Sequence, residues 1–183
     1  MIALVGLLVA IAFTATGGAT ERAHRARCRS DLAVLAHALE TYRTTFGDYP
    51  QTAAAANDPA GVAALDDGPG ILFNALTGRR GPGATLVPMV ARSTVTLSAF
   101  ALQSGDLPAA GTSAQSANAF LDPWGRRYLY CYKTGPAWTA HTPLLFSAGP
   151  DGMAELPADP ATWDGTPPSG TAANADNLLA FGP

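Results

Sequence analysis

The sequence predicts an α+β protein in which one long N-terminal α-helix packs on a small antiparallel β-sheet, followed by a loop-rich C-terminal region. Three observations support this class. The first 20 residues carry no charge and run without a proline into an amphipathic segment that ends at Gly47 and Pro50. Most of the 19 Gly and 15 Pro residues come later, which is typical of loops and short strands. Two segments with strand character, residues 126–134 and 142–149, lie near the C-terminus.

Residues 1–20 are the first part of this helix. At about 1.5 Å per residue they span about 30 Å, the thickness of the hydrocarbon layer of a membrane. A helix that is apolar on every side must be buried, so it either crosses a membrane or packs against copies of itself. Small residues among large aliphatic ones allow helix backbones to approach closely. The residues expected to pack in such a filament core are Leu4, Gly6, Leu7, Leu8, Ile11 and Phe13.

Residues 21–47 are the amphipathic continuation of the helix. Apolar residues such as Leu32, Leu35 and Leu39 recur at helical spacing, so this half is expected to pack on a domain. The only basic cluster, residues 21–29, directly follows the apolar segment. We interpret it as a collar that faces solvent or lipid headgroups.

Residues 48–183 are expected to form one globular domain. Its variable loop region, residues 51–120, contains a short helix around residues 71–76 and a strand within 93–102. The C-terminal loop, residues 150–183, has little apolar content. It is therefore expected to be ordered only if something holds it.

The best strand prediction is residues 126–134. Its three tyrosines, Tyr128, Tyr130 and Tyr132, alternate with Leu129 and Cys131, so the tyrosines lie on one face and the other two residues on the opposite face. Residues 142–149 are expected to pair with it antiparallel after a turn at 135–138. Asp122 is expected to cap the turn before Trp124, whose indole covers the core.

Composition excludes several functional classes. The net charge of −3 and the single lysine, Lys133, argue against nucleic-acid binding, which needs clustered basic residues. The three histidines are far apart, no serine lies in a G-x-S-x-G motif, and no Gly-rich loop links a strand to a helix. The chain is therefore not expected to be an enzyme.

A combination of motifs indicates a family. The apolar helix continues into "RARCRSDLAVLAHALETYRTTFGDYP", then come "DPWGRRYLYCY" and "LFSAGPDG", followed at a distance by "NADN". Together they resemble the major pseudopilins of type II secretion systems and related type IV pilin-like filament subunits. The resemblance covers residues 1–50 and about 120–177. It implies a type IV pilin-like fold and a structural subunit that is made as a prepilin and cleaved by a dedicated peptidase.

The resemblance also implies where the subunit acts. It would be held in the inner membrane and then extracted by the secretion or pilus assembly machinery into a periplasmic or extracellular helical filament of many copies. The family usually has a glutamate at the fifth mature position, where this chain has Val5. This chain also lacks the helix-kinking proline that is common in the family. A solvated or methylated N-terminus would avoid a buried amine. The alternatives are a membrane-anchored binding module that never polymerises and a minor, priming pseudopilin.

Calcium is the cofactor that the resemblance implies, holding the C-terminal loop onto the sheet. Calcium takes oxygen ligands from carboxylates, amides and backbone carbonyls. Carried over to this sequence, Asp151 and Asp176 are the expected ligands, with Ser147 and Asn174 supplying weaker or backbone ligands. The alternative is that these residues only cap turns.

Cys28 and Cys131 are the only cysteines, and they form either one disulfide or two thiols. An oxidising compartment and a strand close to the long helix favour the bond. If Cys28 lies too far toward the membrane end, the two Cα atoms are more than about 7 Å apart and no bond forms.

Overall fold

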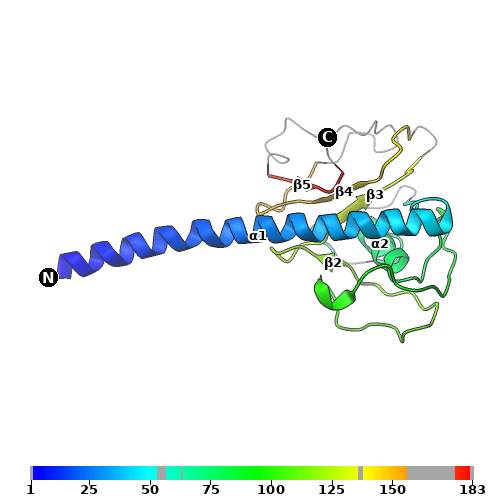
Figure 1. Ribbon diagram of the computed structural model, residues 1–183, viewed down its shortest axis with the longest axis horizontal. Coiled ribbons are helices and arrows are strands. Elements are labelled where there is room, and N and C mark those ends of the chain that lie inside the picture. The colour runs from blue at the N-terminus through cyan, green and yellow to red at the C-terminus, as the bar shows by residue number, and fades with distance from the viewer. Residues whose placement is uncertain (1, 53–56, 63, 136–137, 156–175, 182–183) are drawn as a thin grey trace.

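The structure, a computed structural model, describes residues 2–52, 57–62, 64–135, 138–155 and 176–181, with side chains from residue 18 onward. Helix α1, Ile2–Phe46, is 45 residues long. Its C-terminal half crosses the globular part and its N-terminal half extends beyond it (Figure 1). Because α1 contacts α2 and the strands β4 and β5, the predicted α+β class is confirmed.

One apolar stripe joins α1 to the domain. Its members are spaced three or four residues apart, which places them on one helix face, and none is more than 1% exposed. The stripe consists of Cys28, Leu32, Leu35, Leu39 and Tyr42. The helix ends at Phe46 because Gly47 adopts a positive φ of 85°, and its N–H donates to the carbonyl of Arg43 at 2.8 Å.

A three-stranded antiparallel sheet lies against the C-terminal half of α1 (Figure 1). Its strands are β3, Leu129–Cys131, β4, Leu144–Ser147, and β5, Leu178–Leu179, in the order β3-β4-β5. The pairing of β3 with β4 is the one that the sequence predicted. Strand β5 was not predicted, and it pairs with the end of β4.

The tyrosine face of β3 forms the centre of the core. Tyr128, Tyr130 and Tyr132 belong to the same buried cluster as the α1 stripe and α2. Leu129 and Cys131 belong to a second cluster with β4, on the opposite side of the strand. The predicted alternation is therefore confirmed, and it directs the tyrosines toward α1.

Helix α2, Gly68–Leu76, is fully buried and matches the short helix predicted around residues 71–76. The carboxylate of Asp67 caps it by accepting a hydrogen bond from the backbone N–H of Gly70 at 2.7 Å. Pro69 lies in the first turn, where a missing N–H costs nothing.

The predicted strand at residues 93–102 is wrong for most of its length. Thr94 donates its backbone N–H to the carbonyl of Leu76 at 2.8 Å, so this stretch follows the end of α2 rather than a neighbouring strand. Only its last residues pair in a second, two-stranded sheet. The elements here are the 3-10 helix η1, Leu97–Ala99, and strands β1, Ala101–Leu102, and β2, Phe120–Leu121.

Candidate functional site

The N-terminal half of α1 is the first candidate. Among the side chains described from residue 18 onward, Cys28 is the first on the helix that is buried. In Figure 1 the N-terminal half of the helix extends beyond the domain. The side chains of the predicted filament-core residues, Leu4 to Phe13, lie outside the described part. Within the part that the structure describes, no helix meets the length and hydropathy expected of a membrane span.

Where α1 leaves the domain, Glu21 is hydrogen-bonded to the turn before β3. One carboxylate oxygen of Glu21 accepts a hydrogen bond from the Trp124 indole N–H at 3.2 Å, and the other accepts one from Arg25 Nε at 2.7 Å. The rings of His24 and Trp124 pack edge to face, with centroids 5.9 Å apart. The Arg25 hydrogen bond is the main cause of the lowered pKa of Glu21. The contacts of Glu21 and His24 with Trp124 attach α1 to the domain at this level.

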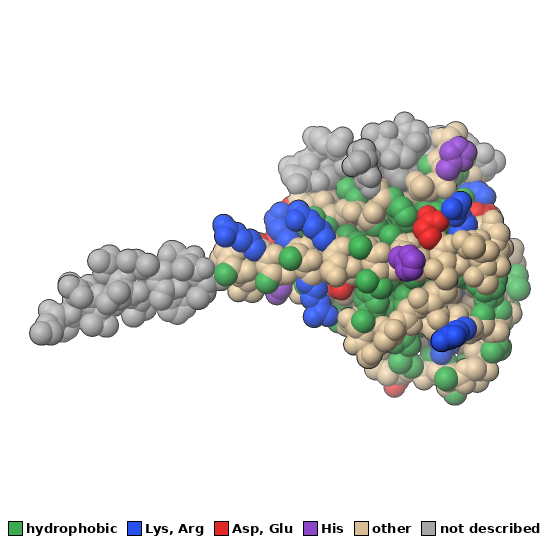
Figure 2. All heavy atoms as spheres, in the orientation of Figure 1, with side chains coloured by type: hydrophobic (Ala, Val, Ile, Leu, Met, Phe, Trp, Pro, Cys, Tyr) green, Lys and Arg blue, Asp and Glu red, His purple; other side chains and the backbone are tan. Residues whose placement is uncertain are grey.

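Basic residues surround the same level of the helix, as Figure 2 shows by the blue side chains near the point where α1 emerges. Arg25 pairs with Glu21, and Arg27 lies 3.7 Å from Asp31. Arg22 and Arg29 are exposed and take part in none of the ion pairs found among the described residues. The predicted collar, residues 21–29, is therefore positively charged, and it directly follows the apolar segment of residues 1–20.

Asp122 caps the turn that leads to Trp124, as predicted. Its carboxylate is 2% exposed and accepts hydrogen bonds from the backbone N–H of Trp124 at 3.0 Å and of Arg126 at 2.9 Å. It also accepts a hydrogen bond from the Ser147 hydroxyl at 2.6 Å. This bond joins β4 to the turn. Burial raises the pKa of Asp122, and the hydrogen bond from Ser147 opposes that rise.

Replacing Asp122 by alanine is expected to lower the free energy of unfolding by about 2 kcal/mol, because one buried and two half-buried donors lose their common acceptor. Asp122→Asn is expected to lower the free energy of unfolding by less, because the amide oxygen can still accept hydrogen bonds from the backbone N–H groups of Trp124 and Arg126.

The two variants also differ in pH dependence. Because the pKa is higher in the folded state, the part of the stability that comes from holding this proton is fully present below the ordinary value of 3.8 and is lost as pH rises through the folded pKa. The hydrogen bonds that Asp122 accepts are not part of this loss. Urea unfolding at several pH values between acid and neutral measures this, and Asp122→Asn should remove that part of the slope. Identical slopes in the wild type and Asp122→Asn would contradict the prediction.

The predicted calcium ligands are brought together only in part. The backbone N–H of Asp151 donates to Asp176 Oδ2 at 3.3 Å, so these two residues are neighbours. Asp176 Oδ1 is buried and has no hydrogen-bond partner among the described residues. The hydroxyl of Ser147 instead donates to Asp122, and Asn174 lies outside the described residues.

A guanidinium already lies on the loop between β4 and β5. Arg126 Nη1 donates to the carbonyl oxygens of Gly149 at 2.8 Å and Pro150 at 3.0 Å. Calcium needs about six to eight oxygen ligands. The carbonyl oxygens of Gly149 and Pro150 already accept hydrogen bonds from Arg126. In the described parts of the chain, no group of three or more His, Cys, Asp or Glu side chains is placed to hold a metal ion. The described residues therefore do not fit a complete calcium site.

Both cysteines are free thiols in the structure, so the predicted disulfide is not formed. Cys28 belongs to the main core cluster and Cys131 to the cluster on the opposite side of β3. Since the tyrosines of β3 face α1, the Cys131 side chain points away from the helix. Burial raises the pKa of Cys28, and it raises that of Cys131 to about 12.

Both thiols should therefore react slowly. We expect alkylation by iodoacetamide to become fast only when the domain is unfolded, because a buried thiol with a raised pKa supplies little thiolate. Intact-mass measurement before and after reduction checks the absence of a bond directly. A gain in mass on reduction would contradict the prediction.

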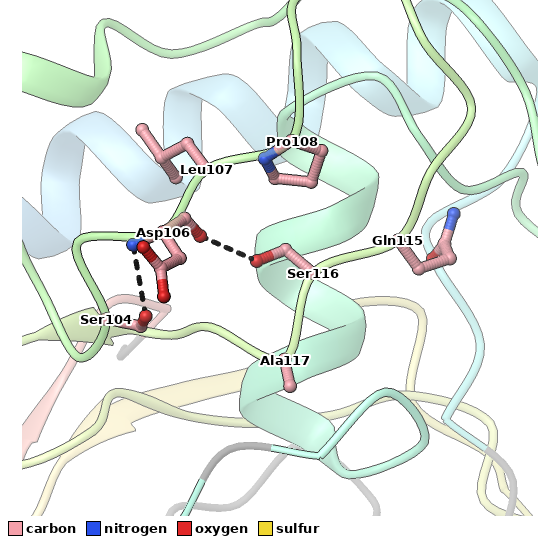
Figure 3. A pocket seen from close by; sticks show the side chains of 7 residues that line it. All are labelled: Ser104, Asp106, Leu107, Pro108, Gln115, Ser116 and Ala117. Atoms are coloured by element: carbon pink, nitrogen blue, oxygen red, sulfur yellow. Dashed lines mark hydrogen bonds between the residues drawn. The ribbon is translucent and has the colours of Figure 1, made fainter.

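A polar hollow of about 480 Å³ lies beside α2. Figure 3 shows its lining, Ser104, Asp106, Leu107, Pro108, Gln115, Ser116 and Ala117. Its polar groups mostly bind one another: the backbone N–H of Asp106 donates to Ser104 Oγ at 3.1 Å, and Ser116 Oγ donates to the carbonyl of Asp106 at 3.4 Å. Among the described residues that line the hollow, only Asp106 is ionisable, so they supply no acid and base pair.

Comparison of the chain with protein-family models, with curated protein sequences and with solved structures finds no match. The strongest candidate element is therefore the one that the geometry itself singles out. It is the half of α1 that leaves the domain, with the contacts of Glu21 and Trp124 at its base.

Proposed function

We propose that the chain is a structural subunit that polymerises through its N-terminal helix into a pseudopilus or pilus-like filament. One observation carries the proposal. Helix α1 is continuous over 45 residues, yet among its side chains described from residue 18 onward the first that is fully buried is Cys28. The preceding residues are uncharged up to Glu21, and an all-apolar helix needs another apolar partner.

Copies of the same helix would supply that partner in a filament. Small residues spread around residues 1–20 allow parallel helices to pack closely. Before assembly, the inner membrane would cover the same surface, and the basic collar would lie at its headgroups. We place the subunit in the inner membrane first and then in a periplasmic or extracellular filament.

The continuity of α1 supports this role. No proline interrupts residues 2–46, and the hydrogen bond from Trp124 to Glu21 attaches the helix to the domain where the helix leaves it. Packing of the helices would therefore determine the position of each globular domain around the filament axis. A flexible tether would not transmit position in this way.

Two alternative functions remain. A membrane-anchored binding module would keep residues 1–20 in lipid permanently. A minor, priming pseudopilin would be present in few copies, and Val5 favours it because the usual glutamate at this position is missing.

Electron microscopy of material sheared from cells, with an antibody to the globular domain, tests the proposal. Labelling along the whole filament supports a major subunit, and labelling only at one end supports the priming role. Antigen that stays entirely in the membrane fraction, with no labelled filament, contradicts polymerisation.

A further inference from the structure

We propose that the guanidinium of Arg126, rather than a bound divalent cation, holds the loop of residues 148–152 and, through it, the C-terminal strand β5. This goes beyond the proposed function, because it concerns how each domain is closed and not how copies assemble. It also departs from the calcium site that the family resemblance implies.

The first step is the position of Arg126. Its backbone N–H is held by Asp122 at 2.9 Å, so the residue starts from a rigid turn. Its Nη1 then bridges two successive carbonyl oxygens of the loop, those of Gly149 and Pro150. No ion pair among the described residues includes Arg126. Its charge is thus directed at backbone carbonyls, the kind of ligand that a hard cation would use.

The second step is that the loop is shaped around this side chain. A Cβ on Gly152 would lie 2.0 Å from Arg126 Nε and 2.4 Å from its Cζ. Any larger residue would displace the guanidinium. Gly152 also has a φ of 72°, which by itself favours glycine, so both the backbone and the guanidinium exclude a side chain at this position.

The third step connects the loop to the C-terminus. A Cβ on Gly149 would lie 2.6 Å from the carbonyl oxygen of Asp176, so the two backbones are in close contact there. The Asp151 N–H donates to the Asp176 carboxylate. Directly after these residues, β5 pairs with β4, and the N–H of Ala180 donates to the carbonyl of Leu145 at 2.9 Å. Arg126 thus fixes the loop on which Asp176 and β5 rest.

A guanidinium can replace an ion here for a physical reason. It carries a permanent positive charge and several N–H donors in one plane, so it can neutralise clustered carbonyl dipoles without free metal. A loop held by calcium depends on calcium concentration, because a ligand that binds only the folded state adds stability by mass action. The stability of a loop held by Arg126 does not depend on the calcium concentration.

The test compares melting of the full chain, purified in mild detergent, in excess EGTA and in millimolar calcium chloride. We expect the wild type to melt at the same temperature in both. Arg126→Gln should lower the melting temperature by about 4–8 °C, the shift expected when a charged donor is lost from a domain of this length. Chymotrypsin should also cleave the C-terminal segment of this variant faster, with or without calcium.

Three further variants make the result specific. Arg92→Gln is the matched control, because Arg92 is exposed and forms none of the ion pairs found in the described residues. Gly152→Ala keeps the arginine but displaces it, so it should lower the melting temperature by more than Gly111→Ala, which adds a side chain at a similar φ (75° against 72°) with nothing within 4 Å. A calcium-dependent rise in the melting temperature that Asp176→Asn abolishes would overturn the proposal. So would an Arg126→Gln variant that melts like Arg92→Gln.

Discussion

Replacing Leu8 by arginine is expected to abolish filaments while the globular domain stays folded. The reason is that residue 8 lies in the uncharged half of the long helix, where the proposed neighbours are copies of the same apolar surface. A charged side chain placed in an apolar environment without a partner costs several kcal/mol, and the cost is repeated in every subunit of a bundle. The loss should therefore be complete rather than partial.

The measurement is electron microscopy of sheared filaments together with circular dichroism of the purified variant. Ala110→Arg is the matched control, because it adds the same charge at an exposed position of the loop region. It should leave filaments normal. Leu8→Ala should weaken assembly less, since it stays apolar. Normal filaments formed by Leu8→Arg would refute polymerisation through this helix.

The elements that the sequence predicts well are those whose signal is local. The end of α1 follows from Gly47 and the apolar spacing before it, and β3 follows from the alternation of tyrosines with Leu129 and Cys131. Periodicity of this kind depends only on neighbouring residues. These elements position the candidate helix, so its relation to the domain could be foreseen.

Contacts between distant segments could not be predicted in the same way. Strand β5 has two residues, and its pairing with β4 joins parts of the chain about 30 residues apart. Trp124 is hydrogen-bonded to Glu21, which lies 103 positions earlier in the sequence. The "DPWG" motif does not indicate which residue its tryptophan contacts. The role of Arg126 has no local signal either, because an arginine at the start of a predicted strand normally indicates only a solvent-facing residue.

The structure has the second of the two alternatives for the cysteines, two thiols, and the sequence carried a signal that favours it. The alternation in β3 already places Cys131 opposite the tyrosines. If the larger tyrosine face packs on the long helix, Cys131 must point away from Cys28. Which face of the strand the helix covers depends on the tertiary arrangement, and the alternation alone does not contain it.

Removing the carboxylate of Asp67 is expected to produce the largest loss of stability in the globular domain. Asp67 forms an ion pair with Arg127, and their side chains are 8% and 3% exposed. The same carboxylate caps α2 through Gly70 and accepts the N–H of Ala64 at 3.1 Å. Asp67→Ala therefore leaves a buried guanidinium without its counter-ion and a buried helix without its cap. Breaking one side of a buried pair typically costs about 3–5 kcal/mol.

A loss of that size is a large share of the total, since domains are usually stable by about 5–15 kcal/mol. Urea unfolding of the full chain in mild detergent, followed by tryptophan fluorescence, measures it. Asp67→Asn separates the two causes, because the amide oxygen can still cap α2 while the charge is gone. Asp66→Ala, at the exposed neighbouring position, is the control. If Asp67→Ala is no less stable than Asp66→Ala, the ion pair with Arg127 does not stabilise the fold. If the double variant Asp67→Asn with Arg127→Met recovers stability relative to Asp67→Asn alone, the cost arises from the unpaired guanidinium.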